Sequence, residues 1–169
     1  ISELQPQGFD FNDFGTLAHA YLEAFANGIQ PKEFIPPSSM ISVLLSAKNK
    51  TKRAEITAIC CDMTHRFEKT AAAQKLKESV MHKTEYKFLH NMDGTLIRGT
   101  IDLLLKNQDG TLCIIDYKTD GKIQVEKYIE QQKCYRQAAS AMFRVPLEKI
   151  TCKLFYLRYA KEIDITSYY

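Results

Sequence analysis

Residues 84–118 constrain the fold most, because three strand-like stretches follow one another there with only short turns between them. The stretches are Thr84–His90, Leu96–Lys106 and Leu112–Lys118. Met92-Asp93-Gly94 separates the first two and Asp109-Gly110 the last two, and Asp-Gly is a strong hairpin-turn signal. Strands joined by such short turns are antiparallel neighbours, so the sequence predicts a three-stranded meander.

Helical periodicity precedes this meander. Apolar side chains recur at helical spacing in three stretches: Phe14–Asn27, Arg53–Phe67 and Ala71–His82. Asp13 is a suitable N-cap for the first of these helices, and Gly28 is a suitable stop. Three prolines make Ile29–Ser39 largely irregular.

After the meander the pattern changes again. Gln124–Phe143 has the pattern of a helix, which Pro146 ends. Thr151–Tyr159 alternates like a fourth strand, and Glu162–Ser167 is a short candidate fifth. The sequence therefore predicts an α/β fold, with a central mixed β-sheet flanked by helices and an N-terminal helical segment.

With 169 residues, 45% of them hydrophobic and 25% charged, the chain has the size and composition of one globular domain. We expect that domain to span residues 1–169, with residues 1–82 as a mostly helical lead-in and residues 83–169 as the sheet core. Because the sequence starts at Ile1 rather than at a methionine, we expect it to be a fragment of a longer protein.

Location is indicated by what the sequence lacks. No run approaches about 18 consecutive apolar residues, and the N-terminus has neither the basic start nor the apolar stretch of a signal peptide. The five cysteines include no C-x-x-C pair, so we expect reduced thiols, no zinc ribbon and no iron–sulfur cluster. A cytoplasmic protein with no membrane partner fits these features.

The charge of the chain leaves nucleic-acid binding open. A formal net charge of +3 permits binding to nucleic acid without requiring it. The most basic run, Lys48–Arg53, fits either a solvated helix start or loop, or a patch that contacts phosphates.

The third strand of the meander ends in charged side chains, which are costly to bury unless they are paired or bound to metal. Side chains alternate along a strand, so Asp116 and Lys118 share one face while Ile115 and Tyr117 share the other. The carboxylate can hold a divalent cation, and the lysine can orient a water or stabilise charge on a phosphate. The alternative is a surface hairpin in which such charges are solvated or salt-bridged.

The loop after the second strand decides which side chains meet. If Gln108-Asp109-Gly110 forms a three-residue loop with its glycine left-handed, counting back pairs Asp102 with Asp116. Directly opposed residues have Cβ atoms about 5 Å apart, and two carboxylates that close repel unless a cation lies between them. A two-residue Asp109-Gly110 loop would instead pair Asp102 with Tyr117 and put the aspartates on opposite faces.

Two segments, Gly99-Thr100-Ile101-Asp102 and Ile114-Ile115-Asp116-Tyr117-Lys118-Thr119-Asp120, resemble the signature of the PD-(D/E)XK nucleases. More narrowly, they resemble the C-terminal nuclease domain of the RecB and AddA helicase–nucleases. Further matches follow the family's order: Gly15-Thr16-Leu17-Ala18-His19, Glu85 in the first strand, and Tyr128-x-x-Gln131-x-x-x-Tyr135. The resemblance spans about residues 12–143.

The resemblance implies a restriction-endonuclease-like core and a role for each matched residue. The implied catalytic residues are Asp102, Asp116 and Lys118. The implied ligands of one or two Mg²⁺ or Mn²⁺ ions are His19, Asp102, Asp116 and the Tyr117 main-chain carbonyl. The residues implied to contact DNA or to support the site are Glu85, Tyr128, Gln131 and Tyr135.

The resemblance also implies a function, which is exonuclease-type hydrolysis of DNA in double-strand-break end processing and recombinational repair. A single-stranded end would be the substrate, and attached helicase domains with a second helicase–nuclease subunit would be the partners, at the nucleoid in the bacterial cytosol. The sequence has no G-x-x-x-x-G-K-[ST] phosphate loop, so we expect no nucleotide in this chain. Two alternatives stay open: a catalytically silent nuclease-fold domain that binds DNA or a partner subunit, and a stand-alone nuclease without a helicase.

Overall fold

The computed structural model describes residues 11–40 and 50–168. The helices are α1 (Phe11–Ala26), α3 (Lys50–Glu68), α4 (Ala71–Glu78) and α5 (Ile129–Phe143). The strands are β1 (Met81–Met92), β2 (Thr95–Lys106), β3 (Leu112–Lys118), β4 (Ile150–Tyr156) and β5 (Lys161–Asp164). Short 3₁₀ turns are η2 (Val125–Tyr128), η3 (Leu147–Lys149), η4 (Leu157–Tyr159) and η5 (Thr166–Tyr168).

Within the described residues, the strands form a five-stranded sheet in the order β1-β2-β3-β4-β5. β1, β2 and β3 are antiparallel neighbours, so the predicted meander is confirmed. The connection through α5 makes β4 parallel to β3, and β5 returns antiparallel to β4. The predicted α/β class, with a central mixed sheet flanked by helices, is therefore confirmed and is consistent with a restriction-endonuclease-like core.

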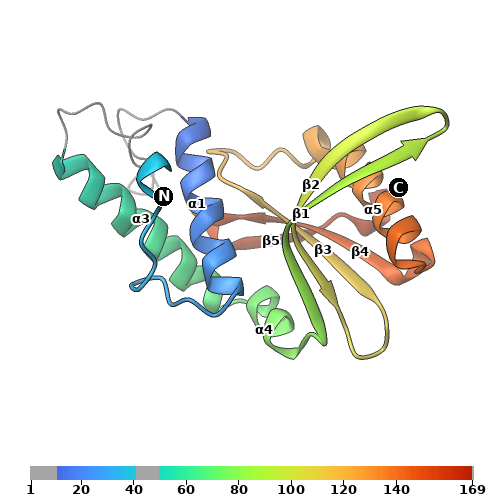
Figure 1. Ribbon diagram of the computed structural model, residues 1–169, viewed down its shortest axis with the longest axis horizontal. Helices are drawn as coiled ribbons and strands as arrows, with labels where there is room; N and C mark the ends of the chain where they lie inside the picture. The colour runs from blue at the N-terminus through green and yellow to red at the C-terminus, as the bar shows by residue number, and fades with distance from the viewer. Residues whose placement is uncertain (1–10, 41–49, 169) are drawn as a thin grey trace.

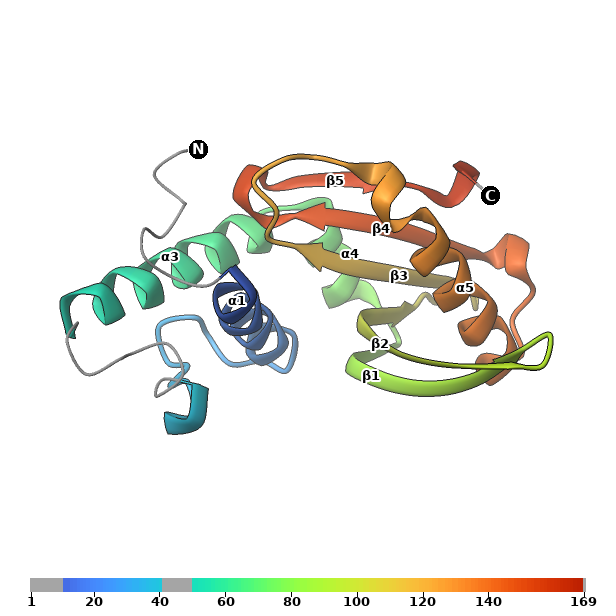
Figure 2. The same cartoon turned by 90° about the horizontal axis from the view of Figure 1, so that it is seen from above.

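Helices cover both faces of the sheet and bury a separate apolar core on each (Figures 1 and 2). The core beneath α1 and α3 includes Phe67, Leu103, Ile115 and Tyr117. The core beneath α5 includes Leu104, Ile114, Ala138 and Leu154. The central strands are buried on both faces, which explains why their sequences are nearly continuous apolar runs.

The helix before the sheet is shorter than the sequence predicts. The Ser79 N–H closes the last turn of α4 on the Leu76 carbonyl at 3.3 Å, and the Val80 N–H bonds to the Lys106 carbonyl at 2.9 Å. The prediction that the helix continues to His82 is therefore wrong, because pairing with β2 outweighs the local helical periodicity.

The predicted strand Thr151–Tyr159 also ends early, at Tyr156. Its last three residues form the η4 turn, closed by Ala160 in a left-handed conformation that sends the chain back into β5. Arg158 in this turn is buried, and its Nε donates to the Thr119 carbonyl at 2.6 Å. The turn is thereby fastened to the loop that follows β3.

Smaller differences lie at other helix ends. The first helix starts at Phe11 rather than at Phe14, while Gly28 has the positive φ expected of a stop. The helix predicted from Gln124 starts with the η2 turn and ends at a left-handed Arg144, before Pro146. Of the basic run, residues 48 and 49 lie outside the described residues, and residues 50–53 begin α3. No helix in the described part of the chain has the length and apolar character needed to cross a membrane.

Candidate active site

The turn between β2 and β3 sets the register on which the site depends. Gln108–Gly110 is a three-residue loop, in which the Asn107 N–H donates to the Thr111 carbonyl at 2.9 Å and the glycine has a φ of +82°. The three-residue alternative is therefore confirmed. Continuing the β2–β3 register by one residue places Asp102 opposite Asp116.

The β2–β3 ladder ends just before these two aspartates, at the pair Leu103 and Ile115. Beyond it, the Asp102 carboxylate takes the place of a main-chain acceptor, because its Oδ2 accepts the Tyr117 N–H at 2.7 Å. A charge-assisted bond of this kind holds the buried carboxylate in one position. Asp102 is thus fixed where β2 stops pairing with β3.

The side-chain alternation of β1 and β2 breaks at Glu85 and Asp102. Leu103 lies in the core beneath α1, but Ile101 lies in the core beneath α5, so the regular alternation of β2 breaks at Asp102. Glu85, opposite Asp102 in the register, has a φ of +45°, which costs a residue other than glycine about 1–2 kcal/mol. As a result, both carboxylates lie beside His19 on the α1 side.

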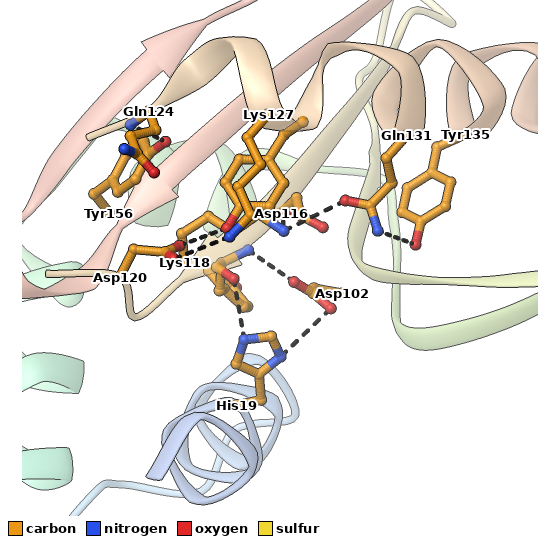
Figure 3. Close-up of polar contacts among 12 residues, drawn as sticks. His19, Asp102, Asp116, Lys118, Asp120, Gln124, Lys127, Gln131, Tyr135 and Tyr156 are labelled. Carbon is orange, nitrogen blue, oxygen red and sulfur yellow. Dashed lines mark hydrogen bonds and ion pairs between the residues drawn. The ribbon is translucent and has the colours of Figure 1, made fainter. Parts of the chain in front are cut away.

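His19 of α1 completes a group of candidate metal ligands (Figure 3). Its Nδ1 lies 3.5 Å from Oδ1 of Asp102 and 3.8 Å from Oε1 of Glu85. Its Nε2 lies 3.1 Å from the Tyr117 carbonyl oxygen. One ligand atom from each of His19, Glu85 and Asp102 lies within 4.8 Å of the others. The imidazole and the two carboxylates form a donor set that fits Mg²⁺ or Mn²⁺.

The imidazole of His19 carries a proton between these carboxylates. Burial lowers the pKa of His19, but hydrogen bonds and charge interactions with Asp102 and Glu85 outweigh burial and raise it from 6.5 to about 10. The imidazolium therefore balances much of the negative charge at the site when no cation is bound.

Asp116 lies outside this group and pairs with Lys118 at the end of β3. The predicted shared face of these two residues is confirmed, because Lys118 Nζ lies 2.5 Å from Oδ2 of Asp116. Asp116 is only 4% exposed. Burial, followed by the charge of Asp102, raises the pKa of Asp116 to about 6, although Lys118 opposes the shift. The two aspartates therefore repel each other, and a cation nearby would relieve that repulsion.

Helix α5 holds the ammonium group of Lys118 from above (Figure 3). Lys118 Nζ lies 3.4 Å from Oε1 of Gln131 and 3.8 Å from the centre of the Tyr128 ring. Gln131 in turn donates to the Tyr135 hydroxyl at 3.1 Å, and the Tyr128 hydroxyl donates to Asp120 at 2.7 Å. Tyr128 of η2 and Gln131 of α5 thus both contact the lysine at the end of β3.

Sequence reasoning assigned no part to three residues that shape this arrangement. Asp120 anchors Tyr128, and its signal was a third charged residue two positions after the end of β3. Gly99 leaves room for Tyr135, because an added Cβ would lie 2.8 Å from that ring and even closer to the Phe88 ring. Arg158 holds the loop after β3, and its signal was a charged residue within a predicted apolar strand.

Comparison with known proteins agrees with this geometry. A family model described as the PD-(D/E)XK nuclease superfamily matches residues 2–166, which is nearly the whole chain. No curated protein matches the chain.

Proposed function

The chain belongs to the PD-(D/E)XK nuclease superfamily, and from this premise we propose that it is a divalent-metal-dependent DNA nuclease. The observation that carries the proposal is the meeting of two groups at the end of β3. His19, Glu85 and Asp102 form one group, and the Asp116–Lys118 pair forms the other. Carboxylates and an imidazole suited to a cation, beside a held ammonium group, are the parts that phosphodiester hydrolysis requires.

We assign one or two Mg²⁺ or Mn²⁺ ions to His19, Asp102, Asp116 and the Tyr117 carbonyl. Glu85 lies near enough to His19 to serve as a ligand itself, rather than only as an auxiliary residue. When bound, such a cation lowers the pKa of a water molecule and neutralises charge on the scissile phosphate. Neither an iron–sulfur cluster nor a nucleotide takes part in this proposal.

The remaining chemistry belongs to Lys118. Its ammonium group donates hydrogen bonds to the attacking water or to a phosphate oxygen, and so stabilises charge that develops in the transition state. Gln131 and Tyr128 position that group through the contacts described above, and Tyr135 orients Gln131. A lysine held in this way loses little side-chain freedom when the substrate binds.

Metal affinity is expected to rise about tenfold per pH unit between about pH 7 and pH 8.5. His19 is protonated throughout this range because its pKa is about 10, so one proton must leave before the cation takes the imidazole nitrogen. Asp116, with a pKa of about 6, is already mostly ionised there. Calorimetric titration with Mg²⁺ at several pH values measures the slope. His19→Gln should bind more weakly with little pH dependence, and equal slopes in the two proteins would contradict this prediction.

We place this activity in a wider setting on the resemblance of the matched motifs to RecB and AddA nuclease domains. In that setting the domain is an exonuclease that degrades single-stranded ends during double-strand-break processing and recombinational repair. Attached helicase domains and a second helicase–nuclease subunit would deliver the strand, at the nucleoid in the cytosol. The full-length gene product would carry ATPase motifs outside residues 1–169 if this setting is right.

The rival is a catalytically silent domain that uses the nuclease fold to bind DNA or a partner subunit. The buried Asp116 carboxylate paired with Lys118 costs desolvation free energy, which a domain without catalytic activity would have no reason to retain. This favours the catalytic hypothesis. The deciding experiment incubates the chain with end-labelled single- and double-stranded DNA in Mg²⁺, Mn²⁺, Ca²⁺ or EDTA. A nuclease shortens the labelled DNA only with Mg²⁺ or Mn²⁺. A silent domain retards the DNA on a native gel without shortening it.

A further inference from the structure

The outer half of the β1–β2 hairpin has one face covered by α5. Residues 86–92 and 95–101 pair with each other but not with β3, and they extend past the other strands toward α5 (Figure 1). The Phe88 ring packs edge-on against Tyr135, with ring centres 5.3 Å apart, and the Tyr86 ring lies 5.8 Å from that of Phe143. These contacts anchor the inner face of the hairpin.

The opposite face, which we call the outer hairpin face, combines basic and apolar side chains. The register gives its members as the cross-strand pairs Lys87–Thr100, Leu89–Arg98 and Asn91–Leu96. Lys87 and Arg98 are exposed, and Leu89 and Leu96 are 57% and 65% exposed. Asp93, in the turn, is the only acidic residue between positions 86 and 101.

The outer hairpin face is continuous with the candidate active site. Glu85 and Asp102 break the strand alternation toward α1, and the next residues on the same side are Lys87 and Thr100. From Lys87 to Asn91 the face extends over about 13 Å, at about 3.3 Å per residue. A ligand lying on this face would therefore reach the carboxylates of Glu85 and Asp102, which lie on the same side beside His19.

We propose that the outer hairpin face holds the unpaired DNA strand on its way to the active site, an inference that rests on the proposed nuclease function. Lys87 and Arg98 complement the negative phosphates, while Leu89 and Leu96 contact the bases. Exposed leucines gain little from a duplex, because the faces of paired bases are covered by stacking on the neighbouring base pairs. Unpaired bases offer apolar faces, so this mixture of side chains favours a single strand.

The decisive measurement is the affinity of a fluorescent oligothymidylate, followed by anisotropy in EDTA over a range of salt concentrations. The test variant is Lys87→Gln/Arg98→Gln. The matched control is Lys149→Gln/Lys161→Gln, which removes the same charge from exposed positions outside the hairpin, with Lys161 in the strand at the opposite sheet edge. Loss of two phosphate contacts should weaken binding about 25-fold at about 0.1 M salt and make the salt dependence shallower by about 1.4. The control should match the wild type.

A second variant separates the apolar contribution. Leu89→Ser/Leu96→Ser should weaken oligothymidylate binding several-fold while leaving the salt dependence unchanged, because no phosphate contact is lost. Equal affinity and salt dependence of the Lys87→Gln/Arg98→Gln variant and its control would overturn the proposal. The proposal would also be overturned if the Leu89→Ser/Leu96→Ser variant bound DNA with unchanged affinity but no longer bound a protein subunit, because the face would then be a protein-docking surface.

A small substrate distinguishes failure of this inference from failure of the nuclease proposal. Bis(p-nitrophenyl) phosphate is too short to reach the hairpin, so both hairpin variants should hydrolyse it with Mn²⁺ at the wild-type rate. If the wild type cleaves neither this compound nor DNA, the nuclease proposal fails. The binding measurement in EDTA still decides whether the outer hairpin face binds single-stranded DNA.

Discussion

Replacing Lys118 with alanine is expected to reduce metal-dependent DNA cleavage on the order of 10³-fold. The Lys118 ammonium group contacts Asp116 and is held by Gln131 of α5, so its removal takes away a positioned positive charge at the site. Cleavage of end-labelled single-stranded DNA in Mg²⁺ and in Mn²⁺ measures the effect. Asp116→Ala should cause a loss of the same order, because it removes both a proposed ligand and the partner of the lysine.

The fold should survive the loss of Lys118. Breaking a buried ion pair normally costs about 3–5 kcal/mol. Here the pKa of Asp116 is already about 6 and would rise further without the lysine, so the carboxyl group can take up a proton instead. Circular dichroism should therefore show a folded protein. Lys122→Ala, at an exposed position just beyond the strand, is the control and should keep full activity. Lys118→Ala activity within tenfold of the wild type would contradict the assignment.

Replacing Asp102 is expected to weaken Mg²⁺ binding about 100-fold or more, because the carboxylate is the residue that joins His19, the β3 main chain and the neighbouring charge of Asp116. Two variants separate its charge from its structural role. Asp102→Asn keeps an acceptor for the Tyr117 N–H and should lose metal binding at little cost in stability. Asp102→Ala also leaves that buried N–H unpaired, at an additional cost of about 1–3 kcal/mol.

Calorimetric titration with Mg²⁺ and chemical denaturation of the same samples test both effects of Asp102. Glu148→Gln removes a carboxylate from an exposed position in η3 and should change neither measurement. If Asp102→Asn bound Mg²⁺ as tightly as the wild type, the carboxylate would have a purely structural role as the acceptor of the Tyr117 N–H.

The arrangement of β2 and β3 was predictable because it depends on local rules. A Gly110 in the left-handed region fixes a three-residue loop, and the loop fixes the register. Strand alternation then puts Asp116 and Lys118 on one face. Each step uses only residues adjacent in sequence or paired across a short turn.

The approach of Glu85 to His19 could not be derived in this way. Strict alternation of β1 and β2 would not turn two consecutive residues of each strand toward α1. The break at Glu85 and Asp102 is stabilised by contacts with a helix more than sixty residues earlier in the chain, such as the ion pairs to His19. Only tertiary packing compensates for a left-handed glutamate.

Arg158 and Asp120 were missed for a related reason. A charged residue in an apolar alternating run carries no indication of its partner, and the partner of Arg158 is a main-chain carbonyl 39 positions away. Asp120 acquires its importance through the Tyr128 hydroxyl, which belongs to a turn rather than to the predicted helix. Both hydrogen bonds fasten the loop after β3, one to the η4 turn through Arg158 and the other to the η2 turn through Tyr128.

The protonated His19 between Asp102 and Glu85 also affects the stability of the site when no cation is bound. Because the imidazolium serves as an internal counter-ion, the two carboxylates can stay in place when the cation is removed. A zinc finger, by contrast, unfolds when its metal is withdrawn. Chelation of this protein should thus produce a dormant but assembled enzyme, and returning the cation would restart it without a refolding step.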